Sequence, residues 1–208
     1  MPKKLTLSRS EVGIFCRDNL YATLMLQSAE DDYVAARCLI LNFLLRGLGL
    51  ASEAIEKALK AILFLETGSK RKGWHKPYEL KEELKKHKKD WSRLDKFDDL
   101  LKRLYSHYQY RYHDNPDKST RQSSQELSEI DELWFYLWDN LPLPDEVKYR
   151  LAFYAWIFEE EFNTDDPKML VNDSRNKFII TRNVAFNNRH DALKKRYSEV
   201  RKHLYPDI

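Results

Sequence analysis

Glycine, proline and cysteine are all scarce in this sequence. Its 208 residues include 5 glycines, 7 prolines and 2 cysteines. So few turn-forming residues leave little material for the many tight turns of an all-β protein. The cysteines, Cys16 and Cys38, stand in neither a metal-binding nor a redox spacing, so we expect two buried or half-exposed thiols.

Long hydrophobic runs are also missing. No window reaches the roughly 18 apolar residues that a membrane-spanning helix needs. The first ten residues contain lysines but no apolar run behind them, so we expect no secretory signal. We therefore expect a cytoplasmic protein without a membrane segment. Gly-rich phosphate loops, HExxH, G-x-S-x-G and cysteine clusters are absent as well, so no cofactor and no metal is expected.

Charge is plentiful but nearly balanced, with 33% charged residues and a formal net charge of +3. Its distribution is uneven. Basic residues crowd between Lys70 and Lys89 and again between Arg189 and Lys202, while the stretch from Glu126 to Asp166 is acidic. This pattern predicts a positive face for phosphate-bearing ligands and a negative face for a partner. The alternative is that these charges are simply the solvated faces of amphipathic helices.

The sequence is organised around one long apolar stretch, Leu48 to Gly68. Its polar stripe, at helical spacing, consists of Glu53, Glu56, Lys57 and Lys60. Each glutamate precedes a lysine by four residues, the favourable order for ion pairs along a helix. Nearly all other positions are Leu, Ile, Ala or Phe, so the helix needs neighbours on two or three sides. We predict the central helix of a bundle, ended by Gly68 in a left-handed conformation.

Apolar residues at intervals of three and four predict further helices on both sides of this stretch. They cover about residues 18 to 40, 77 to 88, 95 to 108, 123 to 141, 147 to 162 and the last residues up to 204. The first ten residues have the character of a tail, and residues 169 to 188 fit either a helix or a short extended piece. Short connections favour antiparallel neighbours. We therefore predict an all-α fold, an up-and-down antiparallel bundle of about six or seven helices.

Three motifs occur in order along the chain. The first is E-K-A-L-K-A-I-L at Glu56 to Leu63, and the second is His75 followed by Leu80 and Leu84. The third is Arg111-Tyr112-His113-Asp114. Together they resemble the signature of the HEPN superfamily (higher eukaryotes and prokaryotes nucleotide-binding), although His113 replaces the proline of the family's R-Y-P-D turn.

The resemblance extends over roughly residues 18 to 141. It implies that residues 1–142 form a HEPN-like helical bundle and that residues 143–208 form a C-terminal helical extension packed on the same bundle. It also implies a bundle that often dimerises, so we expect a homodimer. Members of the superfamily bind nucleotides or RNA, and many are ribonucleases in toxin–antitoxin or phage-defence systems. Some are encoded beside a minimal nucleotidyltransferase partner.

Ribonuclease chemistry without a metal needs a base for the ribose 2′-hydroxyl, an acid for the leaving oxygen and a cation for the pentavalent charge. The nuclease members of the superfamily supply these with an R-x(4–6)-H motif. This chain has no clean copy where the family would place it. Arg103 and His107 share a helix face but are too close in sequence, and Arg182 and His190 are one residue too far apart. These four residues are the candidate catalytic residues.

The segment around Arg111 is the better candidate site. Its tyrosines offer flat faces on which a base can stack, and Arg111 and His113 offer donors to phosphate. The candidate nucleotide- or RNA-binding residues are Lys57, Lys60, His75, Tyr108, Arg111, Tyr112 and His113. The alternative for the alternating tyrosines is core and cap packing at a helix end.

Three functions are therefore compared. The first is a HEPN-like protein that binds a nucleotide or RNA, possibly within a toxin–antitoxin or defence system. The second is a metal-independent ribonuclease toxin that uses an arginine–histidine pair. The third is a non-catalytic dimerisation or interaction module, in which the acidic, tryptophan-rich stretch holds a partner such as a nucleotidyltransferase.

Overall fold

The computed structural model describes residues 5–71, 73–87, 91–109, 124–152, 154–155, 157–159 and 174–206. Its long helices are α2 (Leu20–Leu41), α3 (Arg46–Thr67), α5 (Asp98–Gln109), α6 (Ser124–Asp139) and α12 (His190–Leu204). The shorter ones are α1 (Arg9–Asp18), α4 (Pro77–Lys85), the 3-10 helix η1 (Ser92–Phe97), α7 (Asp145–Leu151), α10 (Ser174–Ile180) and α11 (Val184–Asn187). Every regular element within these ranges is helical, which confirms the predicted all-α class.

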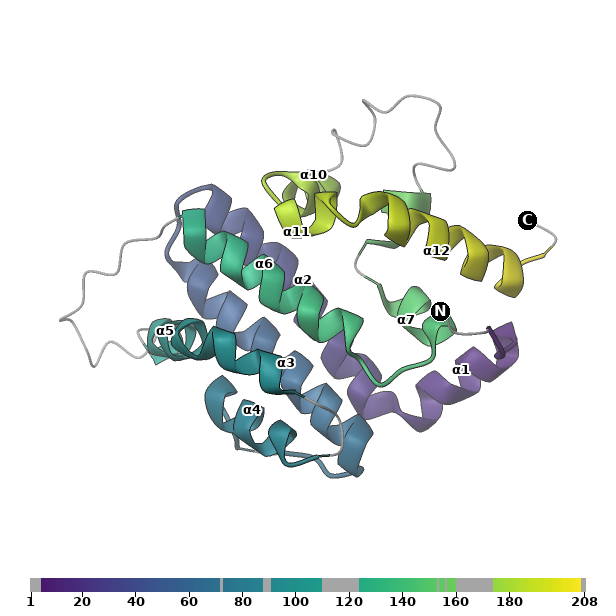
Figure 1. Cartoon of the computed structure of the whole chain (residues 1–208), viewed down its shortest axis with the longest axis horizontal. Helices are drawn as coiled ribbons and strands as arrows, with labels where there is room; N and C mark the ends of the chain where they lie inside the picture. The colour runs from purple at the N-terminus through teal and green to yellow at the C-terminus, as the bar shows by residue number, and fades with distance from the viewer. Residues whose placement is uncertain are drawn as a thin grey trace.

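Helix α3 lies at the centre of the molecule, as its composition predicts. Helices α2, α4, α5 and α6 all contact it (Figure 1). Its apolar residues from Leu48 to Leu63 are buried, apart from the partly buried Leu50, and Glu56 and Lys60 of the polar stripe are only 7% exposed each. Gly68 ends the helix with a φ of 69°, the left-handed conformation that glycine adopts without steric cost.

The N-terminal part contains one more helix than its sequence pattern indicated. The predicted tail contains only the first two residues of α1, Arg9 and Ser10, and the rest of α1 lies before the helix predicted from about residue 18. Helix α1 begins after a capping box between Ser8 and Glu11. The Ser8 hydroxyl accepts from the Glu11 amide, while the Glu11 carboxylate accepts from the Ser8 amide. These bonds satisfy two of the amide groups that a helix start leaves without partners, so a short helix can form here.

Helices α2 and α3 form a close antiparallel pair joined by a short turn. A Cβ atom on Gly47 would lie 2.7 Å from Cγ1 of Ile40 and 2.8 Å from the carbonyl oxygen of Ala36. Only glycine fits there, so the two backbones are in direct contact near the turn. Phe43, within the turn, has a φ of 59° and is 81% exposed.

The C-terminal part packs against the other side of α2 and α6. Helix α7 ends at Leu151 because Ala152 is extended, so the single helix expected from 147 to 162 is interrupted. Helix α10 contacts α2, α11 contacts α6, and α12 lies beside α7 (Figure 1). The stretch whose conformation the pattern left open is helical in α10 and α11.

A buried polar network joins this C-terminal part to α2 and α6. Arg37, fully buried on α2, forms an ion pair with Asp131 of α6. Its guanidinium also donates to the carbonyl oxygens of Phe178 and Thr181. The Tyr33 hydroxyl donates to Asp131 over 2.7 Å. Burial, together with the Asp131 charge, raises the pKa of Tyr33, so its phenol remains a donor.

None of the helices in the described ranges is long and apolar enough to cross a bilayer.

Candidate functional site

A group of polar and aromatic side chains gathers where α3, α4 and α5 meet. Glu56 and Lys60 come from α3, where their spacing of four residues puts them on one face. His75 lies two residues before Pro77, which begins α4. Tyr108 lies in the last turn of α5. Residues from three separate segments therefore converge beside the central helix.

The Glu56 carboxylate connects the two basic members of this group. Its Oε1 accepts from Lys60 Nζ over 2.6 Å and lies 3.2 Å from His75 Nδ1. Because a carboxylate only accepts, Nδ1 carries the proton in this contact and Nε2 is left to other partners. The His75 side chain is 55% exposed, whereas Glu56 and Lys60 are buried. The buried pair thus orients an exposed imidazole.

Aromatic rings extend the site along α5. The rings of His75 and Tyr108 are nearly parallel, with centroids 6.4 Å apart and an interplanar angle of 14°. Tyr105, one turn earlier, is again nearly parallel to Tyr108 at 6.2 Å. Tyr78 of α4 meets the Tyr105 ring edge-on. Flat, half-exposed rings in a row offer surfaces on which nucleobases stack.

The loop from Ser69 to Lys76 brings positive charge to the same end of α4. The Arg71 guanidinium lies over the Trp74 ring at 5.6 Å and donates to Glu83 over 2.9 Å. Lys70 lies over the Tyr21 ring at 5.1 Å. These contacts fix the direction of the basic side chains.

The predicted binding residues divide into three groups. Lys60, His75 and Tyr108 come together as described. Lys57 contacts α2 instead, because its Nζ donates to Asp32 over 2.5 Å and to Ser28 over 2.8 Å. The predicted residues Arg111, Tyr112 and His113 lie outside the described residues, which stop at Gln109 in this region.

The first arginine–histidine pair, Arg103 and His107, lies on the α5 surface that faces α6. Arg103 forms ion pairs with Glu129 and, at 3.5 Å, with Glu126. His107 is 7% exposed. Burial lowers the pKa of His107, and Arg103 lowers it further while Glu126 opposes the shift. A neutral imidazole near an arginine has the chemistry of a general base, although both side chains also contribute to the packing of α5 on α6.

The second pair, Arg182 and His190, lies in the C-terminal part. Arg182 is exposed and has a φ of 54°. The His190 ring packs edge-on against Phe158 and Phe186, with centroids 5.5 and 5.6 Å away. Its Nδ1 lies 3.1 Å from the Asp191 carboxylate. His190 therefore serves as part of an aromatic cluster.

Glu56, Arg71, Tyr78 and Tyr105 belong to the α3–α4–α5 site and were not among the predicted residues. Glu56 and Tyr105 carried a signal in the spacing of the sequence. Glu56 precedes Lys60 by four residues, the spacing of a helix ion pair, and Tyr105 precedes Tyr108 by three. The spacing predicts which side chains share a face, but not that His75 folds back onto Glu56.

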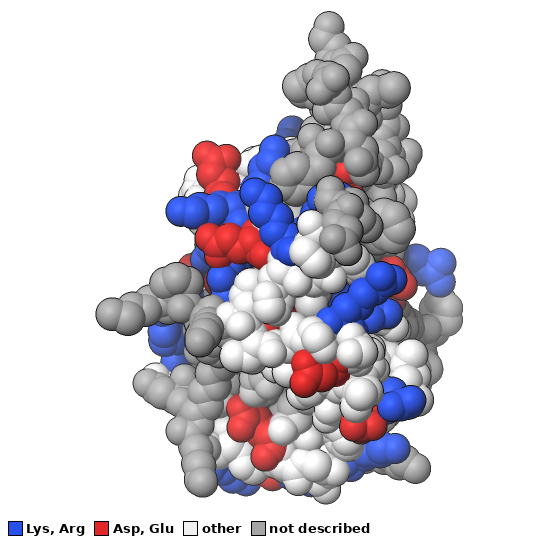
Figure 2. Space-filling model, turned by 90° about the vertical axis from the view of Figure 1, so that its right-hand side faces the viewer, with Lys and Arg blue, Asp and Glu red and all other residues white. Residues whose placement is uncertain are grey.

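The basic group near the C-terminus does not form a positive face. Arg196 pairs with Asp145 and Glu199, each at 2.7 Å, and Arg201 pairs with Glu159 at 3.2 Å. Figure 2 shows the side of the molecule where α1 and α12 lie, and there acidic and basic side chains are interspersed around uncharged surface. For this group the solvated, ion-paired alternative describes the structure.

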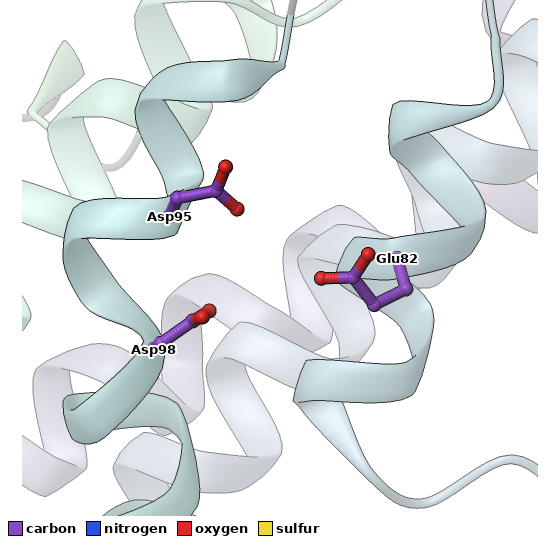
Figure 3. Close-up of side chains that lie close together, drawn as sticks. All are labelled: Glu82, Asp95 and Asp98. Carbon is purple, nitrogen blue, oxygen red and sulfur yellow. The ribbon is translucent and has the colours of Figure 1, made fainter.

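An acidic triad between α4 and the start of α5 has the residue types of a cation site. Glu82, Asp95 and Asp98 turn their carboxylates toward one another, with ligand atoms within 4.8 Å (Figure 3). The ammonium of Lys81, itself 1% exposed, pairs with all three. Burial alone would lower the pKa of Lys81, but these hydrogen bonds outweigh it and raise the pKa. The triad therefore binds a lysine of the chain and fastens α4 to α5.

Comparison with known proteins identifies the family. No significant match was found among curated proteins or among solved structures. The family model described as the HEPN domain matches residues 22–133, from the first turn of α2 to just past the middle of α6. Because the match covers more than half of the chain, this chain belongs to the HEPN domain family and is, at the level of that superfamily, a helical protein related to nucleotides and RNA.

Proposed function

We propose that this HEPN-domain protein binds a nucleotide or single-stranded RNA at the α3–α4–α5 site. The observation that carries the proposal is the Glu56 oxygen shared by Lys60 and His75, which holds an exposed imidazole parallel to Tyr108. In this proposal the base stacks on the Tyr108 and His75 rings. Basic side chains of the neighbouring loop hold the phosphates.

Phosphate binding in the proposal uses Arg71 together with Arg111 and His113, which follow Tyr108 in the sequence and lie outside the described residues. Arg71 lies in the loop that precedes α4, and its guanidinium contacts the Glu83 carboxylate and the Trp74 ring. The finer role, in a toxin–antitoxin or defence system with a nucleotidyltransferase-like partner and as a homodimer, is part of the same proposal and is supported only by family membership.

The test is the binding of a fluorescent single-stranded RNA, followed by anisotropy at several salt concentrations. We expect Tyr108→Ala to weaken binding by about 5- to 150-fold, because stacking on one aromatic ring contributes about 1–3 kcal/mol per base. His75→Ala should weaken it as well. Affinity should fall with rising salt, since phosphate contacts release counterions.

His203→Ala is the matched control, because this histidine is exposed on α12 and contacts the Leu7 carbonyl. It should bind RNA like the wild type. Equal affinity of all three variants would contradict the proposed site. A cleavage assay without divalent metal uses the same samples together with a His107→Ala variant. Loss of cleavage in His107→Ala alone would instead support the ribonuclease function with Arg103 and His107.

A further inference from the structure

The face of α3 that carries Glu56 and Lys60 continues to an aromatic residue, Phe64. Phe64 follows Lys60 by four residues, the spacing that Lys60 also has from Glu56, so the three side chains share one face. Helix α2 runs antiparallel to α3, and its start therefore lies beside the end of α3. There the rings of Tyr21 and Phe64 meet, with centroids 5.0 Å apart. Tyr21 thus contacts one end of this face, and His75 contacts the other.

Tyr21 lies close enough to the α3–α4–α5 site to respond to its charge. Burial raises the pKa of the Tyr21 phenol, and the Glu56 carboxylate raises it further. Glu56 is the residue that accepts from Lys60 and contacts His75. The Tyr21 phenol and the His75 imidazole therefore share one electrostatic environment, although they are distant in sequence.

A basic side chain lies on the Tyr21 ring. The Lys70 ammonium is 5.1 Å from the ring centroid, and Lys70 is exposed. The loop that carries it, residues 69–76, contains no acidic residue. A cation on an exposed ring is held weakly, so a base can take its place while the ammonium turns toward a phosphate. Aromatic rings beside basic side chains are the combination with which proteins bind single-stranded nucleic acids.

The rings of His75 and Tyr21 contact positions of α3 that are too far apart for one nucleotide. His75 contacts Glu56 and Tyr21 contacts Phe64, and these two positions are about 12 Å apart along the helix axis. Stacked nucleotides follow one another at about 3.4 Å along a strand. About four nucleotides therefore reach from one ring to the other, whereas a mononucleotide reaches only one of them.

We propose that Tyr21 and Lys70 form a second nucleotide subsite, so that the site takes a segment of single-stranded RNA rather than a mononucleotide. The inference rests on the proposed function, in which the first base stacks on Tyr108 and His75. The strand then crosses the buried ion pair of α3, and a later base stacks on Tyr21. The Lys70 ammonium binds a phosphate next to that base.

The experiment compares adenosine monophosphate with tetra-adenylate, a single strand of the same nucleotide. Binding to the full chain is measured by isothermal titration calorimetry. We expect the wild type to bind tetra-adenylate at least about tenfold more tightly, because a second base stacks. Tyr21→Leu keeps an apolar contact with Phe64 but removes the flat face. This variant should weaken tetra-adenylate binding by about 5- to 150-fold and leave the binding of the monophosphate unchanged.

Tyr205→Leu is the matched control, because Tyr205 is a half-buried tyrosine with the Arg9 guanidinium 4.8 Å from its ring centroid. It should bind both ligands like the wild type, and so should Tyr21→Phe, which retains the flat ring. Should Tyr21→Leu fail to fold, Lys70→Ala decides, because it changes an exposed side chain. It should weaken only tetra-adenylate and lower the slope of log affinity against log salt by about 0.7.

Tyr108→Ala separates this inference from the proposed function, because it should weaken the binding of both ligands. If it does, but tetra-adenylate binds normally to the deciding variant, the second subsite is wrong and the proposed function stands. Equal wild-type affinity for the two ligands, or an equal loss of both in Tyr21→Leu, would also overturn the second subsite. No effect of Tyr108→Ala on either ligand would contradict the proposed function, and this inference with it.

Discussion

His107 shows how burial changes the chemistry of one residue. Its imidazole lies at the contact of α5 with α6, where water can no longer stabilise a positive charge. Burial therefore lowers its pKa in the folded chain, with Arg103 adding to the shift and Glu126 opposing it. In the unfolded chain the ring is hydrated and titrates near 6.5. The two states thus bind protons differently.

This difference predicts a dependence of stability on pH. Between the folded pKa and about 6.5 the unfolded chain binds the proton more tightly, so the free energy of unfolding decreases as the pH falls through this window. One such group contributes a slope of at most about 1.4 kcal/mol per pH unit. His107→Gln should remove this component, as measured by denaturant unfolding between about pH 5 and 8.

The control is His203→Gln, which leaves His107 in place and should retain the wild-type slope. If His107→Gln lost stability toward acid pH as steeply as the wild type, the slope would have another origin.

The spacing of residues in the sequence predicted part of the site. Spacing along α3 indicated the Glu56–Lys60 pair, and the pair is present. Spacing could not show that Lys57, from the same polar stripe, bonds to Asp32 and Ser28 on another helix. That contact depends on how α2 and α3 are placed in three dimensions, which a one-dimensional pattern does not specify.

At the scale of helices, the contact of α2 with α3 depends on one glycine. Atoms of Ile40 and Ala36 lie within 3.0 Å of the position that a Cβ on Gly47 would take. The atom of Ala36 is its carbonyl oxygen, which belongs to the backbone and cannot rotate away as a side chain can. An added methyl group must push the helices apart or distort the turn between them.

Gly47→Ala should therefore destabilise the protein by about 1–3 kcal/mol, as overpacking does. Gly13→Ala is the matched control, because Gly13 lies in α1 with nothing within 4 Å of its Cβ position. There the change should stabilise the protein by up to about 1 kcal/mol through helix propensity. Melting temperatures of the two variants should move in opposite directions, and a shared direction would contradict the close-contact explanation.

Helix prediction succeeded where the apolar period was long and unbroken. Helix α3 is such a case, and its end at Gly68 was predicted as well. Helix prediction failed where a helix began or ended for a reason that the spacing of apolar residues does not show. Ser8 and Glu11 start α1 through a capping box, and Ala152 leaves the helical conformation within a continuous apolar pattern. Competing contacts of α7 with α1 and α12 are tertiary, so the local pattern did not contain them.

At the scale of the whole molecule, we propose that residues 143–208 pack on residues 1–142 and stabilise their fold. Arg37 forms hydrogen bonds with carbonyl oxygens of Phe178 and Thr181 in addition to its ion pair with Asp131. The Phe135 ring of α6 packs against Phe186 of α11. Without the C-terminal part, a buried guanidinium would lose two acceptors and an apolar face of α6 would meet water.

Ending the chain after Pro142 should lower the free energy of unfolding by at least about 3 kcal/mol, as expected when a buried charge loses partners. Thermal unfolding followed by circular dichroism measures the loss. Arg37→Met in the full chain tests the network itself and should also be destabilising, since Asp131 is then buried without its cation. A shortened chain as stable as the full one would show that residues 1–142 form an independent domain.

The network around Arg37 also sets how freely the sequence of each part of the chain can change during evolution. In α2 and α6 the network depends on side chains, because its contacts need the guanidinium of Arg37, the carboxylate of Asp131 and the phenol of Tyr33. In the C-terminal part the network depends on main-chain oxygens, which every residue possesses. Phe178 and Thr181 can therefore be substituted by other residues without loss of these hydrogen bonds. The C-terminal segment can diverge in sequence while it stays attached to the same place on the bundle.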